Sequence, residues 1–235
     1  MILPGFAIKS SIFLNSEIFP GGFRLSLQQN ILMRKVIYQQ WLSLDGYAAD
    51  ANGSVTFIEP TTTNKYSDLE QLQWLDTIDT IILGANTYKL FIEFWPTATT
   101  DDEIIADKLN NIPKIVFSKS LKAAPWGKWP AARVIATDAV QALRELKSQP
   151  GKDIVLWGSI SLAQSFMKAN LIDEYHFRVC PVVLGSGRQQ FENTGHLEFD
   201  LFDSTSHESG LVVLKYRQRP KRTDTASRVI HASPE

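Results

Sequence analysis

Short apolar runs alternate with segments of helical periodicity along most of this chain. The clearest run, Ile154 to Trp157, contains no polar residue and is typical of a strand buried on both faces of a parallel sheet. Gly158 and Ser159 interrupt this run, and apolar residues then recur at helical spacing from Ile160 to Met167. We therefore predict a strand that ends in a turn of small residues and leads into a helix beginning near Ser159.

The same alternation predicts the rest of the fold. Strands are expected at 35–44, 79–83, 113–117, 133–136 and 175–184, and helices at 66–78, 85–94, 102–109 and 139–147. The helix at 66–78 is predicted to be amphipathic from a stripe at three-residue steps, formed by Leu69, Leu72, Leu75 and Ile78. Two final runs, 197–206 and 210–217, are typical of an antiparallel pair. The pattern indicates an α/β layered domain with a mixed, mostly parallel sheet and an antiparallel C-terminal edge.

The two ends of the chain differ from this regular middle part. Residues 1–32 mix prolines and glycines with short apolar pieces and have no sustained period. We therefore expect an N-terminal extension at 1–32, a single core domain at 33–219 and a polar, flexible tail at 220–235.

Composition excludes several classes of protein. The chain is 44% apolar and 21% charged with a formal net charge of -1, which is typical of a globular protein and not of a general nucleic-acid binder. No apolar run is long enough to span a bilayer, so we expect a cytoplasmic protein. Cys180 is the only cysteine and lies in an apolar run, where a buried thiol is expected. The four histidines show no ligand spacing, and no metal site is predicted.

Four predicted strands end in small, hydroxyl or charged residues. These ends are Asp45-Gly46, Gly84 to Thr87, Ser118-Lys119 and Gly158-Ser159. In open α/β sheets the ligand binds outside the carboxyl ends of the strands, so these residues predict one cleft. A turn without a bulky side chain at a helix N-terminus can accept a pyrophosphate, although the same turn can be an ordinary strand-to-helix connection with a serine N-cap.

These pieces, in this order, resemble the dihydrofolate reductase fold, which has three α/β/α layers. The resemblance is closer to the reductase domain of bacterial riboflavin biosynthesis, the RibD C-terminal domain, and to its stand-alone relatives. It covers roughly residues 33–217 and is carried by Ser43 to Tyr47, Leu83 to Tyr88, Phe117 to Leu121, Trp157 to Ser159, Leu171 to Glu174, Pro181 to Gly187, and Phe191.

The resemblance implies that NADPH binds at these strand ends. The residues implied on the pyrophosphate side are Gly158, Ser159, Ile160 and Leu162, and those opposite are Gly84 and Thr87. Ser118 and Lys119 would face the adenosine 2′-phosphate, where a cation and a hydroxyl distinguish NADPH from NADH. Gly46 and Ala48, in the loop after the first strand, would border the nicotinamide and the substrate. The chain departs from the family at Ala85, where relatives often carry an arginine.

Candidate catalytic chemistry is sparse, because hydride transfer needs little beyond orientation and one proton donor. Asp45 is the candidate donor or substrate-orienting group, and the alternative is a loop aspartate that binds nearby backbone N–H groups. Glu174 and His176 share one strand face, where a structural hydrogen bond is more usual than a catalytic dyad. The candidate pocket aromatics are Trp41, Tyr47, Phe57 and Trp95, and core packing is the alternative for most of them.

Together these features predict an NADPH-dependent oxidoreductase that transfers hydride to a C=N or C=O bond of a small pteridine-, pyrimidine- or sugar-like substrate. Without a fused deaminase domain or an arginine-rich phosphate pattern, the riboflavin step itself is the less favoured activity. The alternatives are a non-catalytic nucleotide-binding or ligand-sensing module and a purely structural dimer. By analogy with the family we also expect a homodimer, through the strand near Tyr175 to Pro181 or the final pair of strands.

Overall fold

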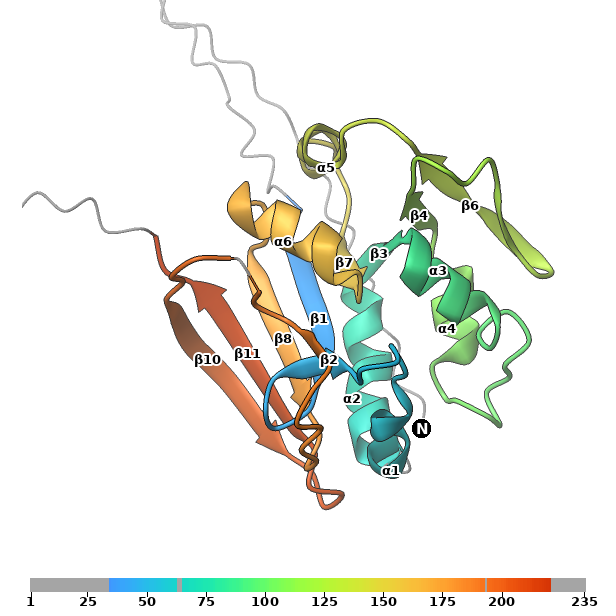
Figure 1. The fold of residues 1–235 in the computed structure, drawn as a ribbon. Helices are drawn as coiled ribbons and strands as arrows, with labels where there is room; N and C mark the ends of the chain where they lie inside the picture. The colour runs from blue at the N-terminus through green and yellow to red at the C-terminus, as the bar shows by residue number, and fades with distance from the viewer. Residues whose placement is uncertain (1–33, 63–64, 193, 221–235) are drawn as a thin grey trace, which may run out of the picture. The chain divides into compact units, whose positions relative to one another are not determined.

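The computed structural model describes residues 34–62, 65–192 and 194–220. Within these ranges nine strands form one sheet (Figure 1), and β2 (Tyr47–Ala49) pairs with β9 (Arg188–Gln189) in a separate two-stranded ribbon. The order of strands in the sheet is β10 (Phe199–Ser206), β11 (Val212–Gln218), β8 (Glu174–Val179), β1 (Val36–Leu42), β7 (Asp153–Trp157), β3 (Ile78–Gly84), β4 (Lys114–Phe117), β6 (Trp129–Ile135) and β5 (Ala124–Trp126).

The sheet is mixed, as the sequence predicts. The six central strands, β8 to β6, run parallel, and β11 and β10 follow β8 as the antiparallel C-terminal edge. A second antiparallel edge, β5 against β6, was not predicted, because Pro125 and two tryptophans favoured a loop there. Strand β8 is paired on both sides, so of the two predicted dimer surfaces only the final pair ends in an edge strand, β10.

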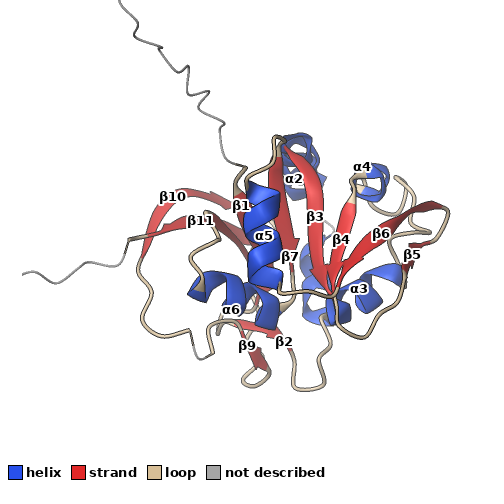
Figure 2. Ribbon diagram, turned by 90° about the horizontal axis from the view of Figure 1, so that it is seen from above, coloured by secondary structure: helices blue, strands red, loops and turns tan. Residues whose placement is uncertain are grey.

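Helices cover both faces of the sheet and complete the three layers (Figure 2). On one face α5 (Ala139–Lys147) and α6 (Ile160–Lys168) bury Leu143 and Phe166 against β1, β7 and β8. The other face is covered by α2 (Lys65–Trp74), α3 (Ala85–Ile92) and α4 (Ala106–Asn111), with the short α1 (Glu59–Thr62) before them. Strands such as β7, buried on both faces, therefore read as continuous apolar runs.

Several predicted elements have different limits in the structure, among them β6, which begins at Trp129 instead of residue 133. The strand predicted at 175–184 ends at Val179, since Pro181 has no N–H to continue the ladder. The helix predicted at 102–109 begins only at Ala106, because the Asp102 carboxylate is bound by Thr99 in the preceding turn. Helix α2 ends at Trp74 and a 3₁₀ turn follows.

The predicted apolar stripe of α2 is also partly wrong. Leu69 is 41% exposed, whereas the polar Gln71 is only 8% exposed and faces the sheet. The predicted N-terminal extension, 1–32, lies outside the described residues, as does all of the predicted tail except its first residue. Among the described helices none is long and apolar enough to cross a membrane.

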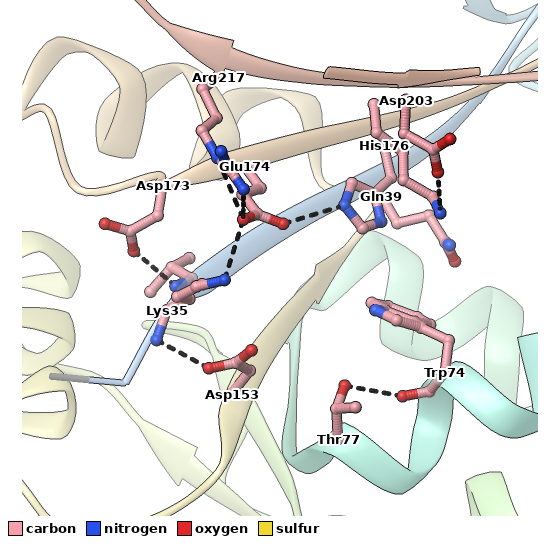
Figure 3. A network of polar contacts seen from close by, with 12 residues as sticks. Lys35, Gln39, Trp74, Thr77, Asp153, Asp173, Glu174, His176, Asp203 and Arg217 are labelled. Carbon is pink, nitrogen blue, oxygen red and sulfur yellow. Dashed lines mark hydrogen bonds and ion pairs between the residues drawn. The ribbon is translucent and has the colours of Figure 1, made fainter. Parts of the chain in front are cut away.

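A network of charged side chains joins the strands at the amino ends of β8 and β1, at the end of the sheet opposite the predicted cleft (Figure 3). The buried carboxylate of Glu174, at the start of β8, accepts hydrogen bonds from Lys35 Nζ at 3.0 Å and Arg217 Nη2 at 3.1 Å. His176 Nε2 lies 3.4 Å from the same carboxylate. The hydrogen bond from His176, and then Lys35 and Arg217, lower the pKa of Glu174 to about 2 against the opposing effect of burial. Glu174 and His176 therefore form a structural pair.

Candidate functional site

The four predicted strand ends meet at one edge of the sheet. Asp45 follows β1, Gly158 follows β7, Gly84 closes β3 and Ser118 follows β4. These strands are neighbours in the order β1-β7-β3-β4 and run parallel, so their carboxyl ends lie side by side. The candidate site is therefore an edge assembled from segments that are far apart in the sequence.

Ser159 joins two of these strand ends. Its Oγ accepts a hydrogen bond from the Gly84 N–H at 2.6 Å and lies 2.8 Å from Thr87 Oγ1. The residue has a left-handed backbone with φ 59°, and its side chain makes no capping bond to its own helix. Ser159 is therefore the N-cap residue of α6 by position, while its hydroxyl is used to hold β3 and α3 against β7.

Glycine is required on both sides of this junction. A Cβ on Gly84 would lie 2.6 Å from Ser159 Oγ, and a Cβ on Gly158 would lie 2.9 Å from Thr87 Oγ1. Gly158 also has φ +56°, which side chains rarely tolerate. The two strand ends approach each other so closely that the side chains of Ser159 and Thr87 occupy the space that a Cβ at either glycine would need.

Helix α6 presents its first turn at the same edge. An α-helix leaves its first N–H groups without intrahelical partners, and they carry partial positive charge. The side chains of Ile160 and Leu162 are partly buried against the core of α5 and α6, so a ligand here would meet their backbone. The N-terminus of α6 can therefore bind an anionic group without any charged side chain.

An open hollow of about 310 Å³ lies beyond the ends of β4 and β6. It is lined by Phe117, Ser118, Lys119, Ile135, Thr137, Asp138, Ala139, Val140 and Ser165. Ser118 Oγ accepts hydrogen bonds from the N–H groups of Ser120 and Leu121, which fixes this turn. The Asp138 carboxylate accepts a hydrogen bond from the Gln141 N–H as the N-cap of α5. The exposed Lys119 is the cation on this wall of the hollow.

Asp45 holds two loops together. Its carboxylate accepts hydrogen bonds from Ser43 Oγ at 2.6 Å, from the Gly185 N–H at 2.7 Å and from the Leu184 N–H at 3.2 Å. The hydrogen bond from Ser43 has the largest effect and lowers the pKa of this exposed carboxyl; desolvation opposes it, and the bonds from the two backbone N–H groups lower the pKa further. The geometry is that of a loop-holding aspartate, and an ionised carboxylate is a poor proton donor.

The rest of the same loop is held by backbone contacts. The carbonyl of Gly46, which has φ +82°, accepts a hydrogen bond from the Gln190 N–H at 3.3 Å. Tyr47 pairs with Gln189 in the β2–β9 ribbon, and the next residue of β2, Ala48, is buried. The loop is therefore held against the segment that follows β8.

A chain of buried side chains beneath this edge was not predicted. Trp157 Nε1 donates to Gln39 Oε1 at 2.8 Å, and the amides of Gln39 and Gln71 bind each other at 2.8 and 3.0 Å. Arg178 Nη1 then donates to Gln71 Oε1 at 3.2 Å. The only signal in the sequence is the presence of polar residues inside apolar segments, and this does not reveal that they meet.

The candidate aromatics divide between the site and the core. The ring of Trp41 lies 4.5 Å from the Arg178 guanidinium carbon, next to the polar chain. Trp95 packs on Phe91 and Phe94 and belongs to the core. Cys180 is fully buried and burial raises the pKa of its thiol, which makes it an unreactive core residue. In the described ranges no group of three or more His, Cys, Asp or Glu side chains could hold a metal.

The layered mixed sheet and its carboxyl-end site define a dihydrofolate reductase-like fold. Residues 34–213 match the RibD C-terminal domain, and the chain belongs to that family. It is 26% identical to the uncharacterized protein YyaP of Bacillus subtilis over 193 residues, covering 81% of this chain and 98% of YyaP.

Solved structures show the same fold. A protein assigned to riboflavin biosynthesis in Shewanella sp. PV-4 superposes with a TM-score of 0.62 at 22% identity, covering 79% of this chain and 99% of that one. Dihydrofolate reductase of Enterococcus faecalis, solved with NADP(H) and RAB-propyl, superposes with a TM-score of 0.50 at 11% identity, covering 79% and 97% of the two chains. The chain therefore has a reductase-like fold.

Proposed function

We propose that this chain is an NADPH-dependent reductase that transfers hydride to a C=N or C=O bond of a small pteridine-, pyrimidine- or sugar-like substrate. The observation that carries the proposal is the junction of Ser159 with Gly84 and Thr87. There two strand ends meet at the N-terminus of α6, whose first N–H groups supply the partial positive charge that favours an anion such as a pyrophosphate. The E. faecalis enzyme, which was solved with NADP(H), shares the fold.

The 2′-phosphate is assigned to the hollow at the end of β4. Lys119 supplies a cation there, and hydroxyl groups of Ser118, Thr137 and Ser165 lie around it. The negative charge of Asp138 would repel a phosphate in this hollow, but its carboxylate accepts the N-cap hydrogen bond of α5. NADH has no group for this hollow, so cofactor preference is the property that the assignment predicts.

The test is a titration of the full-length protein with NADPH and NADH, followed by tryptophan fluorescence. Lys119→Glu places a like charge beside the 2′-phosphate and should weaken NADPH binding about tenfold or more, while NADH binding stays unchanged. Lys122→Glu is the matched control, because it makes the same charge change at an exposed residue outside the hollow. Equal losses for both cofactors in Lys119→Glu would remove Lys119 from this role. A wild-type protein that binds neither cofactor would refute the reductase proposal.

The hydrogen-bonded carboxylate of Asp45 favours a second candidate function, that of a nucleotide-binding or ligand-sensing module without turnover. With both carboxylate oxygens accepting hydrogen bonds, Asp45 serves to position the loop more readily than to donate a proton. If the protein is instead a reductase, the proton for the reduction comes from water or from the substrate and not from Asp45. Loss of NADPH absorbance in the presence of candidate substrates separates the two functions, since a binding module retains affinity and oxidises nothing.

The oligomeric state is also part of the proposal. We assign homodimerisation to the C-terminal pair β10 and β11, where Leu201 and Phe202 are 52% and 40% exposed. Light scattering of the wild type and of Phe202→Lys measures this directly. A monomeric wild type would contradict the assignment.

A further inference from the structure

The hollow beyond the ends of β4 and β6 has one charged group of each sign on its walls. Lys119 lies in the turn after β4, and Asp138 lies between β6 and α5. Both residues are exposed, and within the described part of the chain neither makes an ion pair. The other polar side chains that line the hollow are the neutral hydroxyls of Ser118, Thr137 and Ser165. The walls therefore carry no net formal charge, while both charged groups remain available to a ligand.

The carboxylate of Asp138 uses one of its two oxygens to cap α5. Oδ1 accepts a hydrogen bond from the Gln141 N–H at 2.8 Å, and Oδ2 has no hydrogen-bond partner among the residues that the structure describes. A hydrogen bond from a neutral N–H does not cancel the charge of a carboxylate, and a charged carboxylate oxygen can only accept. A ligand group beside Oδ2 is therefore favoured when it has a proton to donate and disfavoured when it is an anion.

The 2′-phosphate that is assigned to this hollow exists in two charge forms. A phosphate monoester loses its second proton at about pH 6, so the group has one P–O–H below this pH and none above it. The monoanion can donate its P–O–H to the Asp138 carboxylate while Lys119 binds an ionised oxygen. The dianion has no proton to donate and brings two negative charges to a third. A hollow with one cation and one carboxylate therefore suits the monoanion better than the dianion.

We propose that the hollow selects the monoanionic form of the 2′-phosphate, and that Asp138 is the residue that determines this specificity. Asp138 accepts the phosphate proton through Oδ2 and lowers the affinity for the dianion, so the preference for NADPH over NADH increases as the pH falls through about 6. Lys119 alone would give the opposite pH dependence, because a cation by itself favours the dianion. The proposal rests on the reductase function and on the assignment of the 2′-phosphate to this hollow.

The probes are NADP⁺ and NAD⁺, which carry the same adenosine groups as the reduced cofactors and are stable in acid. The full-length protein is titrated with each at pH 5.5 and pH 8, followed by tryptophan fluorescence. The ratio of the NADP⁺ affinity to the NAD⁺ affinity is the quantity compared, because it removes effects of pH that do not involve the 2′-phosphate. In the wild type this ratio should be about threefold or more higher at pH 5.5 than at pH 8.

Asp138→Asn removes the charge and keeps the helix cap, since asparagine and aspartate are equally good N-cap residues. At pH 8 the variant should have a ratio about fivefold higher than the wild type, because the dianion no longer meets a carboxylate. Its own pH dependence should be reversed, with the higher ratio at pH 8, because Lys119 then acts alone. A residue that only caps α5 would leave the pH dependence of the ratio unchanged.

Asp107→Asn is the matched control, because it makes the same charge change at an exposed residue of α4 that does not line the hollow. It should keep the wild-type ratio at both pH values. Asp138→Ser also keeps the cap and provides the same test if Asp138→Asn does not fold.

The role of Asp138 would be overturned if the ratio in the wild type did not rise at pH 5.5, or if the Asp138 variants kept the pH dependence of the wild type. An equal change in Asp107→Asn would also overturn it, since the effect would then come from net charge. In each of these cases NADP⁺ still binds and the reductase proposal stands. A wild type that binds neither probe would refute the reductase proposal and the role of Asp138 with it.

Discussion

The substitution Gly158→Ala adds one methyl group at the point where β7 turns into α6. Two physical effects are expected. The backbone at position 158 has φ +56°, and the new Cβ would lie 2.9 Å from Thr87 Oγ1 and 3.0 Å from Thr87 Cγ2. The first effect is backbone strain, which is local to residue 158. The second is a steric clash with Thr87, which lies on α3 after the end of β3.

The two effects have different sizes. A left-handed backbone costs an alanine roughly 1–2 kcal/mol relative to glycine. Displacing packed atoms typically costs about 1–3 kcal/mol more, because the side chain of Thr87 must leave its contact with Ser159. We therefore expect Gly158→Ala to lower the free energy of unfolding by about 2–5 kcal/mol.

Urea unfolding followed by circular dichroism measures this loss, and two further variants separate its parts. Gly185 has φ +71° with nothing within 4 Å of an added Cβ, so Gly185→Ala reports the backbone effect alone, about 1–2 kcal/mol. In the background of Thr87→Ala the steric part should disappear, which a double-mutant cycle detects as a coupling of about 1–3 kcal/mol. If Gly158→Ala costs no more than Gly185→Ala, or if the cycle shows no coupling to Thr87, the close contact between position 158 and the Thr87 side chain does not exist as described.

Three titrating groups give further predictions. Glu174 has a folded pKa of about 2, below its unfolded value of 4.5, so its contribution is present above pH 4.5 and is lost toward pH 2. Glu174→Gln should cost roughly 2 kcal/mol at pH 7, since Lys35 and Arg217 are half exposed, and nothing near pH 2, by urea unfolding. The folded pKa of Asp45 is also lowered, so Asp45→Asn should be less stable than the wild type at pH 7, and the difference should shrink as the pH falls below about 4. Burial lowers the pKa of Lys114 to about 7. Because an unfolded lysine has a pKa of about 10.4, stability should rise from pH 7 to 10, and this slope should be absent in Lys114→Met. A constant difference across pH would contradict each of these three assignments.

Periodicity was sufficient to predict most of the layered fold. The apolar run of β7, from Asp153 to Trp157, and the helical spacing of α6 could be read locally because both faces of the strand and one face of the helix are buried. The order of strand ends, from Asp45 to Gly158, also indicated which residues meet, since parallel strands place their carboxyl ends at one edge. The errors came where side chains override the local pattern, as at Pro181 and in the turn at Asp102.

Other properties depended on contacts between distant segments. The hydroxyl of Ser159 binds Gly84 rather than its own helix because β3 and β7 are neighbours, although 75 residues separate the two positions. The Asp45 carboxylate is held by N–H groups from 139 and 140 residues further along the chain. The sequence by itself determined the elements and the edge at which they end, because periodicity and strand direction are local properties. Only the tertiary structure decided how Asp45, Gln71 and Arg178 are used, because the hydrogen-bond partners of a polar group depend on which segments are packed against it.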